Sequence, residues 1–331
     1  MNIGGWSSIL VAAMLLAVCV CAQAQQPGNI PRIGFLTNQT ITSSTSSGPN
    51  IEAFRQGLRD LGYTEGKNII IEYRGAGGKH ERMPELVAEL IGLGVNVIVT
   101  TGMPAVIAAK KATSTIPIVA ATADNLVEAG VVASLAHPGG NVTGSTRVDA
   151  DFSAKRLELL KESFPKLFCV AVLSHGSMGG DEEELQEIQS AGRKLAIQVQ
   201  PFPTPDPRQF PSTFTEMKKR RADALIFLAS SFTGFHRKQL MEFATKHRLL
   251  TMCSSASWID DGCVIAYGPK VSELYRRAAT FVDKILKGAK PADLPVEQPT
   301  KFELIINLKA AKQIGLTIPP NVLVRADRVI R

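Results

Sequence analysis

The 331-residue sequence lacks the motifs on which most catalytic proteins depend. It has no G-x-S-x-G turn around a nucleophilic serine and no phosphate-binding P-loop. Its five histidines are scattered without the spacing of a metal site: His80, His137, His175, His236 and His247. We therefore expect no catalytic residues, no bound metal and no cofactor.

Aromatic side chains and clustered positive charge are also scarce. Phe, Trp and Tyr together make up 6% of the chain, and the net charge of +7 is spread among acidic residues. The basic runs at 218–221 and 276–277 are short, as on a solvated helix face. Because nucleic-acid binding needs a basic face with aromatic residues for stacking, we expect no nucleic-acid partner.

Long apolar runs are also scarce, and the one that could be a targeting segment lies near the start, at residues 9–20. It has the length of a signal-peptide core and is shorter than the ~20 residues of a membrane span. Ala22-Gln23-Ala24 fits a cleavage site, although no Lys or Arg precedes the run. Lipid attachment at Cys19 or Cys21 is disfavoured because Val precedes each. We expect a signal peptide at 1–24 and a periplasmic protein.

Three cysteines follow this segment. Cys169 lies in a strand-like run and is expected to be a small buried apolar residue. Cys253 and Cys263 either pair in an oxidising compartment or remain two buried thiols, and their spacing does not decide between these.

The remaining chain alternates strands with helices, which predicts parallel sheets wound on both faces by helices. The first array has strands at 32–37, 68–73, 97–99 and 116–121, with helices at 50–61 and 81–93, after Pro104, and between Asn125 and Pro138. The glycine-rich stretch 140–145 is predicted to be the pivot that leaves this array.

A second array follows, with strands at 169–174, 196–201, 224–229 and 249–253 and helices at 151–163, 181–195, 214–221 and 236–247. Strand-like 264–267 is expected to cross back, followed by a helix at 273–286, a strand at 302–306 and a last helix ending at Gly315. We expect an N-terminal lobe of 30–143 plus 268–298 and a C-terminal lobe of 144–267 plus 299–331.

Polar turns at the strand ends are the candidate ligand contacts, since the ends of parallel strands meet at one edge. Those of the first array are Thr37, Asn38, Thr100, Thr101, Gly102, Met103, Asp124 and Asn125. Those of the second are Ser174, His175, Ser230, Ser231, Phe232, Ser254 and Trp258. Each also has an ordinary structural interpretation: Thr101, Asp124 and Asn125 suit helix N-caps, and Trp258 suits packing.

Seven segments together resemble the family of ABC-transporter substrate-binding proteins that includes tryptophan- and tyrosine-binding lipoproteins. They are RIGFLT, AFRQGLRDLGYTEGKNIIIEYR, ATSTIPIV, ASLAHPGGNVTG, KRLELLKE, YGP and RRAATFVDKILKGAKPADLPVEQPTKFELIINLKAAKQIGLTIPP. The resemblance implies a type I periplasmic-binding-protein fold: two doubly wound lobes, three hinge crossings and a ligand bound between the lobes. Many relatives have Asp-Pro where this chain has Asp124-Asn125.

The resulting hypothesis is an exported, monomeric solute-binding protein that closes over a small organic ligand and delivers it to ABC permease membrane subunits. An exported enzyme on the same scaffold is an alternative, with Ser174, His175 and Asp124 as candidate groups. A ligand-sensing partner of a membrane receptor is another. A sugar-repressor-like regulator is disfavoured because the chain has an export signal and no DNA-binding head.

Overall fold

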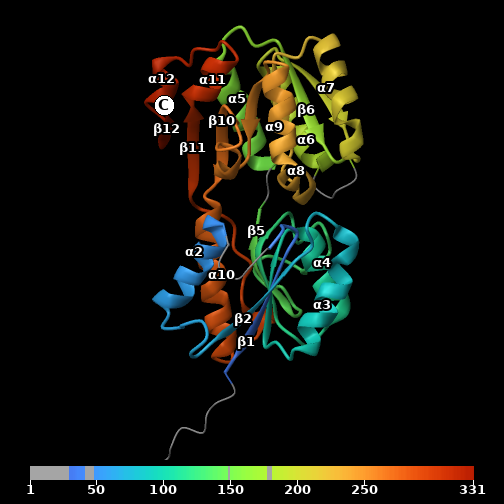
Figure 1. The fold of residues 1–331 in the computed structure, drawn as a ribbon, viewed down its shortest axis with the longest axis vertical. Coiled ribbons are helices and arrows are strands. Elements are labelled where there is room, and N and C mark those ends of the chain that lie inside the picture. Colours follow the sequence, from blue (N-terminus) through green and yellow to red (C-terminus); the bar gives the residue numbers. More distant parts are fainter. Residues whose placement is uncertain (1–29, 42–47, 148–149, 177–180) are drawn as a thin grey trace, which may run out of the picture.

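The computed structural model describes residues 30–41, 48–147, 150–176 and 181–331. These residues form two α/β lobes stacked along the long axis of the molecule, each built on its own sheet (Figure 1). The expected signal peptide, 1–24, lies outside the described residues. Within the described part, no helix combines the length and the apolar character needed to cross a bilayer.

The N-terminal lobe contains a five-stranded parallel sheet in the order β2-β1-β3-β4-β5. Its strands are β1 (Arg32–Thr37), β2 (Ile70–Gly75), β3 (Val97–Thr101), β4 (Ile118–Ala123) and β5 (Val142–Thr146). Its helices are α2 (Pro49–Asp60), α3 (Met83–Gly92), α4 (Met103–Ala112) and, from much later in the chain, α10 (Val271–Leu286).

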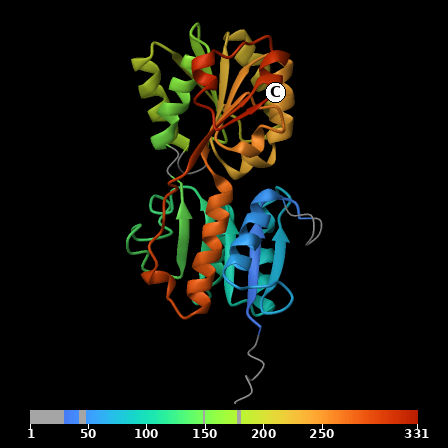
Figure 2. The ribbon, with the colours of Figure 1, turned by 90° about the vertical axis from the view of Figure 1, so that its left-hand side faces the viewer.

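Alternation along the strands explains why helices cover both faces of this sheet. Val97 and Val99 pack with Phe54 of α2 and Phe281 of α10, whereas Ile98 packs on the other face against α3 and α4. Successive strand residues point to opposite faces, so an uninterrupted apolar strand needs a helical layer on each side. Figure 2 shows α10 lying along the N-terminal sheet although it follows the C-terminal strands in sequence.

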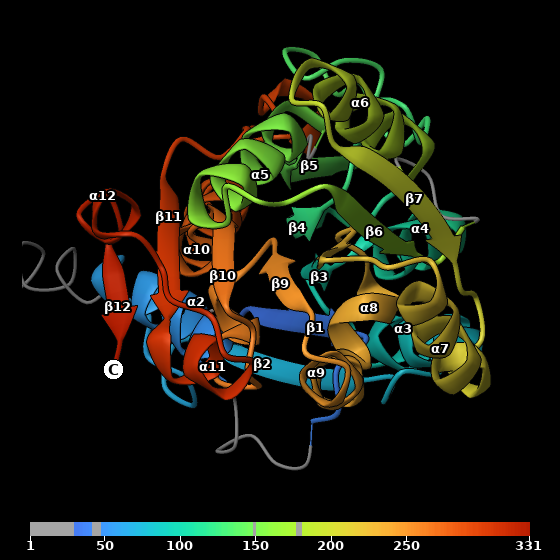
Figure 3. The ribbon, with the colours of Figure 1, turned by 90° about the horizontal axis from the view of Figure 1, so that it is seen from above.

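The C-terminal lobe has a seven-stranded sheet in the order β12-β11-β10-β9-β8-β6-β7, parallel except for the β10–β11 pair. Its strands are β6 (Cys169–Ser174), β7 (Gln198–Pro203), β8 (Ala224–Phe227), β9 (Leu250–Cys253), β10 (Ile265–Pro269), β11 (Phe302–Asn307) and β12 (Arg328–Ile330). Its helices are α5 (Ala150–Ser163), α6 (Asp181–Lys194), α7 (Phe210–Lys219), α8 (Ser231–Phe235), α9 (Arg237–Lys246), α11 (Leu308–Gln313) and α12 (Pro320–Leu323). Figure 3 shows α5 and α6 on one side of this sheet and α7 and α9 on the other.

The chain passes between the lobes three times: after β5, between β10 and α10, and before β11. The segments next to two of the crossings are tied together by the backbone, because Glu297 N donates to Gly144 O and Thr146 N donates to Glu297 O. The predicted fold of two doubly wound lobes with three crossings is therefore confirmed. Strand β5 keeps residues 144–146 in the N-terminal sheet, so the predicted pivot at 140–145 is wrong and the crossing begins after Thr146.

The predicted helix between Asn125 and Pro138 is also wrong, because this segment forms turns. Gly130 adopts a left-handed φ of 62° and ends the first turn. Lys110 Nζ then donates to the carbonyl oxygens of Gly130 and Val131, at 3.0 and 2.5 Å. Val131 and Val132 are buried in the core, so apolar burial helps to fix a segment that forms successive turns and no continuous helix.

Cys253 and Cys263 form a disulfide, which settles the alternative that their spacing left open. The bridge joins the end of β9 to the segment that leads into β10. Cys169 is a buried free thiol, as predicted, and burial raises its pKa.

Candidate ligand-binding cleft

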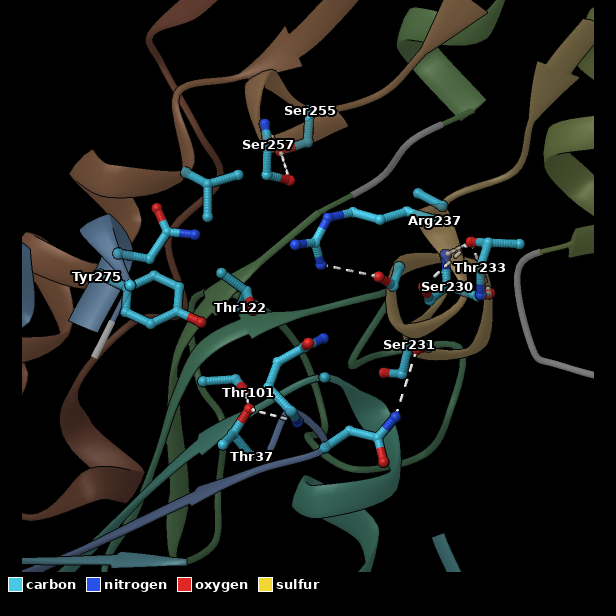
Figure 4. Close-up of a pocket in the computed structure, with 18 of the residues that line it drawn as sticks. Thr37, Thr101, Thr122, Ser230, Ser231, Thr233, Arg237, Ser255, Ser257 and Tyr275 are labelled. Carbon is cyan, nitrogen blue, oxygen red and sulfur yellow. Dashed lines mark hydrogen bonds between the residues drawn. The ribbon is translucent and has the colours of Figure 1, made fainter. Parts of the chain in front are cut away.

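A cavity of about 380 Å³ lies between the lobes and is lined by both. This is the size of a site for a small organic molecule. Most of the side chains that Figure 4 labels around it carry hydroxyl groups. The charged residues among the described lining are Asp124, Arg147 and Arg237.

The N-terminal lobe contributes threonines from the ends of neighbouring strands. Thr37 ends β1, Thr101 ends β3 and Thr122 lies in β4, and the parallel register brings them together. Thr101 Oγ1 donates to Thr37 Oγ1 at 2.8 Å. Thr101 therefore does not cap α4, whose N-cap is Gly102 with no side-chain cap. The start of this helix lies at the edge of the cavity, which Gly102 lines.

Tyr275 of α10 completes this wall and was not among the predicted residues. Its side chain is 9% exposed and its hydroxyl makes a hydrogen bond with Thr101. Burial raises the pKa of Tyr275 to about 12, although Thr101 and the charge of Arg147 both act to lower it. The phenol therefore stays protonated at neutral pH and can donate or accept a hydrogen bond.

The C-terminal lobe contributes the turns that follow β8 and β9. Ser230 and Thr233 form a capping box at the start of α8, because each side chain bonds the backbone N–H of the other. Ser255 caps the short 3-10 helix Ala256–Trp258 by accepting from Ser257 N. These caps hold the serine turns in place at the cavity edge.

Arg237 reaches the cavity from the first residue of α9. Its Nε donates to Asp261 Oδ2 at 2.6 Å and its Nη1 donates to the carbonyl oxygen of Gly234 at 3.2 Å. Arg237 was not among the predicted residues, because the prediction considered polar residues at strand ends and Arg237 lies at the start of a helix.

Asp124 lies at the end of β4, and its carboxylate pairs with Arg147 at 2.7 Å. The same turn is fixed by Thr146 Oγ1, which donates to Asp124 O at 3.0 Å. Asn125 Oδ1 instead accepts from Glu128 N at 3.3 Å and stabilises the following turn. Of the two residues of this turn, Asp124 is thus the one that lines the cavity.

The structure brings nine of the fifteen predicted residues to the cavity wall: Thr37, Asn38, Thr101, Gly102, Asp124, Ser230, Ser231, Ser254 and Trp258. The other six do not line it: Thr100, Met103, Asn125, Ser174, His175 and Phe232.

Packing explains most of these exclusions. Thr100 is fully buried because strand alternation turns it away from Thr101. Met103 packs against the core under α3 and α4. The ring of His175 lies edge-on to Phe232 at 4.9 Å, and Phe232 is itself a core residue.

The two lobes touch beside the cavity. Asn38 Nδ2 donates to Ser231 O at 3.4 Å. A Cβ atom on Gly102 would lie 2.4 Å from Ser231 Oγ, and one on Gly78 would lie 2.3 Å from the Phe235 ring. Helix α8 therefore packs so closely against Gly102 and Gly78 that neither position has room for a side chain.

Two α/β lobes joined by three crossings around a polar cavity define a type I periplasmic binding protein. The chain belongs to the family described as ABC transporter substrate binding protein, whose model matches residues 40–330.

Several known proteins are similar to this chain. A tyrosine-binding protein of Clostridioides difficile (strain R20291) is 24% identical over 271 residues, which cover 80% of this chain and 76% of that protein. The crystal structure of an ABC domain from Streptococcus pneumoniae in complex with L-Trp has a TM-score of 0.81 and 24% identity, covering 91% and 99% of the two chains. The crystal structure of a conserved domain protein from Vibrio cholerae has a TM-score of 0.80 and 24% identity, and it also covers 91% of this chain and 99% of that chain.

Proposed function

We propose that this protein is an exported solute-binding protein that captures a small organic ligand, an amino acid or a similar molecule, and delivers it to ABC permease membrane subunits. The observation that carries the proposal is the cavity itself, because its described lining comes from both lobes. A ligand that contacts both lobes stabilises their closed arrangement over an open one.

The wall chemistry supports reversible binding of a polar molecule. Hydroxyl groups of Thr37, Thr101 and Tyr275 face hydroxyl groups of Ser230 and Ser231 across the cavity. The crossings after Thr146 and at Lys270 would act as hinges, so the moving bodies would be 30–146 plus 271–298 and 150–269 plus 299–331, which moves the expected lobe boundaries at 143/144 and 267/268 to the ends of β5 and β10. The relatives that bind tyrosine and L-Trp support an amino acid or a molecule of similar size.

We propose the periplasm as the compartment and a monomer as the working form. The disulfide between Cys253 and Cys263 supports an oxidising compartment. No group from the enzyme alternative lines the cavity except Asp124, whose carboxylate pairs with Arg147. We therefore propose binding without chemical change of the ligand.

Calorimetry on matched variants tests the proposal, using the ligand released from the denatured protein. Asp124→Asn removes the carboxylate that pairs with Arg147, which alters both the charge of the cavity wall and the hold on that arginine, so affinity should change by roughly tenfold. Asp60→Asn is the control, since Asp60 pairs with Arg276 on the outside of the same lobe. Equal affinity of the Asp124→Asn variant and the wild type, or chemical turnover of the ligand, would contradict the proposal.

A further inference from the structure

Arg237 is the charged group that the C-terminal lobe presents to the cavity. In Figure 4 its guanidinium extends into the cavity, on the side opposite Thr101 and Thr37. The side chain is 28% exposed, which leaves it partly shielded from water but open to a ligand. A guanidinium in such a place forms strong, charge-assisted hydrogen bonds with carboxylates.

The guanidinium is held in position from behind. Asp261 accepts from Nε and the carbonyl of Gly234 accepts from Nη1, and Asp261 does not line the cavity. An arginine has five N–H groups, and among the described residues no third group accepts from this one. The remaining N–H groups are therefore fixed in orientation and available to a ligand.

The other charges of the cavity wall differ in this respect. Asp124 and Arg147 both line the cavity, and they neutralise each other at 2.7 Å. Arg237 differs from them because its counter-ion, Asp261, does not line the cavity. The cavity favours a negative group at this position.

The aromatic residues of the wall offer little ring surface for stacking. Trp258 is 4% exposed and packs on Phe227, with ring centroids 4.9 Å apart. Tyr275 is 9% exposed and is engaged with Thr101. The remaining walls are dominated by hydroxyl groups, which bind polar groups of a ligand better than an aromatic ring.

We propose that Arg237 binds a carboxylate of the ligand, and that the ligand is a small organic acid whose chain carries hydroxyl or amide groups. Asp261 is the positioning residue for this arginine. The inference rests on the proposed function and narrows it to a ligand class.

The test is a thermal-shift screen followed by calorimetry with four probes, L-malate, L-glutamine, L-tyrosine and L-tryptophan, each as the free acid and as its primary amide. We expect a free acid to raise the melting temperature while its amide does not, with malate or glutamine ahead of the aromatic pair. Arg237→Gln should weaken binding of that acid by roughly tenfold to a hundredfold. Asp261→Asn should weaken it less, because the guanidinium is still present but less well oriented.

Arg325→Gln is the matched control, since Arg325 pairs with Glu162 on the surface of the same lobe and should leave binding unchanged. Amides that bind as well as acids, or an Arg237→Gln variant that binds as the wild type does, would overturn the role of Arg237 while leaving the proposed function intact. Tighter binding of tyrosine or tryptophan than of malate or glutamine would overturn only the proposal that the ligand's chain carries hydroxyl or amide groups. Binding of no probe in either form would count against the proposed function itself.

Discussion

In the N-terminal lobe the hydroxyl groups of Thr37 and Thr101 face the cavity from strand ends, whereas in the C-terminal lobe the serines of the cavity wall lie on capped turns after the strands. Thr37 and Thr101 are fixed by the register between β1 and β3. Ser230 and Ser255 are fixed by the helical turns they cap. The pairing of strands therefore positions the threonines of the N-terminal wall, whereas helix caps outside the sheet position the serines of the C-terminal wall.

The two lobes are also stabilised differently. Arg156 and Glu184 form an ion pair in the C-terminal lobe in which both side chains are buried, and the disulfide lies in the same lobe. The described residues of the N-terminal lobe contain no disulfide and no ion pair with both side chains buried. That lobe relies on apolar packing, completed by α10 from late in the chain.

The largest effect should come from the buried ion pair of the C-terminal lobe. Arg156 Nη1 donates to Glu184 Oε1 at 2.7 Å, and the arginine side chain is fully buried. Glu184→Ala leaves that charge without its carboxylate, so the free energy of unfolding should fall by about 3–5 kcal/mol. Urea denaturation measures it.

The comparison is with Glu52→Ala in the N-terminal lobe. Glu52 pairs with Arg59 on the surface, with side chains 51% and 45% exposed. Its loss should change stability by no more than about 1 kcal/mol. Similar losses for the two variants would show that the lobes do not differ in this way.

Next in size is the disulfide. Replacing Cys253 and Cys263 together by Ser releases a loop of sequence separation 10, which should lower stability by about 2–3 kcal/mol. Thermal melts with and without dithiothreitol measure the loss. The reductant should lower the melting temperature of the wild type and leave the double variant unchanged; a shift of the double variant would show that the effect has another source.

The contact between the lobes should give a smaller effect. Gly102 has a φ of 81° and a Cβ there would meet Ser231 Oγ, so Gly102→Ala should cost stability and also hold the lobes apart. We expect a total cost of about 1–2 kcal/mol and a larger radius of gyration in solution scattering.

A second change separates the two costs of Gly102→Ala. Ser231→Gly in the same chain removes the contact, so it should restore the compact form but not the lost stability. Gly62→Ala is the control, because Gly62 has a φ of 89° with open space around it. If Gly62→Ala expands the molecule as much, the interlobe contact is not the cause.

The smallest of the four effects is on pH dependence. Burial lowers the pKa of His80 in the N-terminal lobe and of His236 in the C-terminal lobe below the ordinary value of 6.5. The unfolded chain therefore binds more protons than the folded one just below that pH, and stability should fall as the pH drops from 7 to 5. His236→Gln should flatten the profile of melting temperature against pH, and His137→Gln, an exposed position, should not.

The sequence predicted the fold well because apolar strands and amphipathic helices alternate throughout. It failed between Asn125 and Pro138, where an apolar segment is buried as turns around Gly130. It also placed the pivot partly inside β5, because Gly144 is accommodated in a strand here.

For the cleft, strand-end polarity indicated Thr37, Thr101 and Asp124 but could not indicate Tyr275 or Arg237. Tyr275 lies on a helix from much later in the chain, and Arg237 begins the helix that follows the expected serines. Such positions depend on how separate elements meet in space.

The central claim is that one small acid occupies the cleft and is held by Arg237. Native mass spectrometry of the gently purified wild type and the Arg237→Gln variant tests it most directly. We predict that the wild type carries one added mass, that of a small carboxylic acid, and that the variant has lost it. The same added mass at the same occupancy in both proteins, or an adduct that contains no carboxylate, would contradict the account.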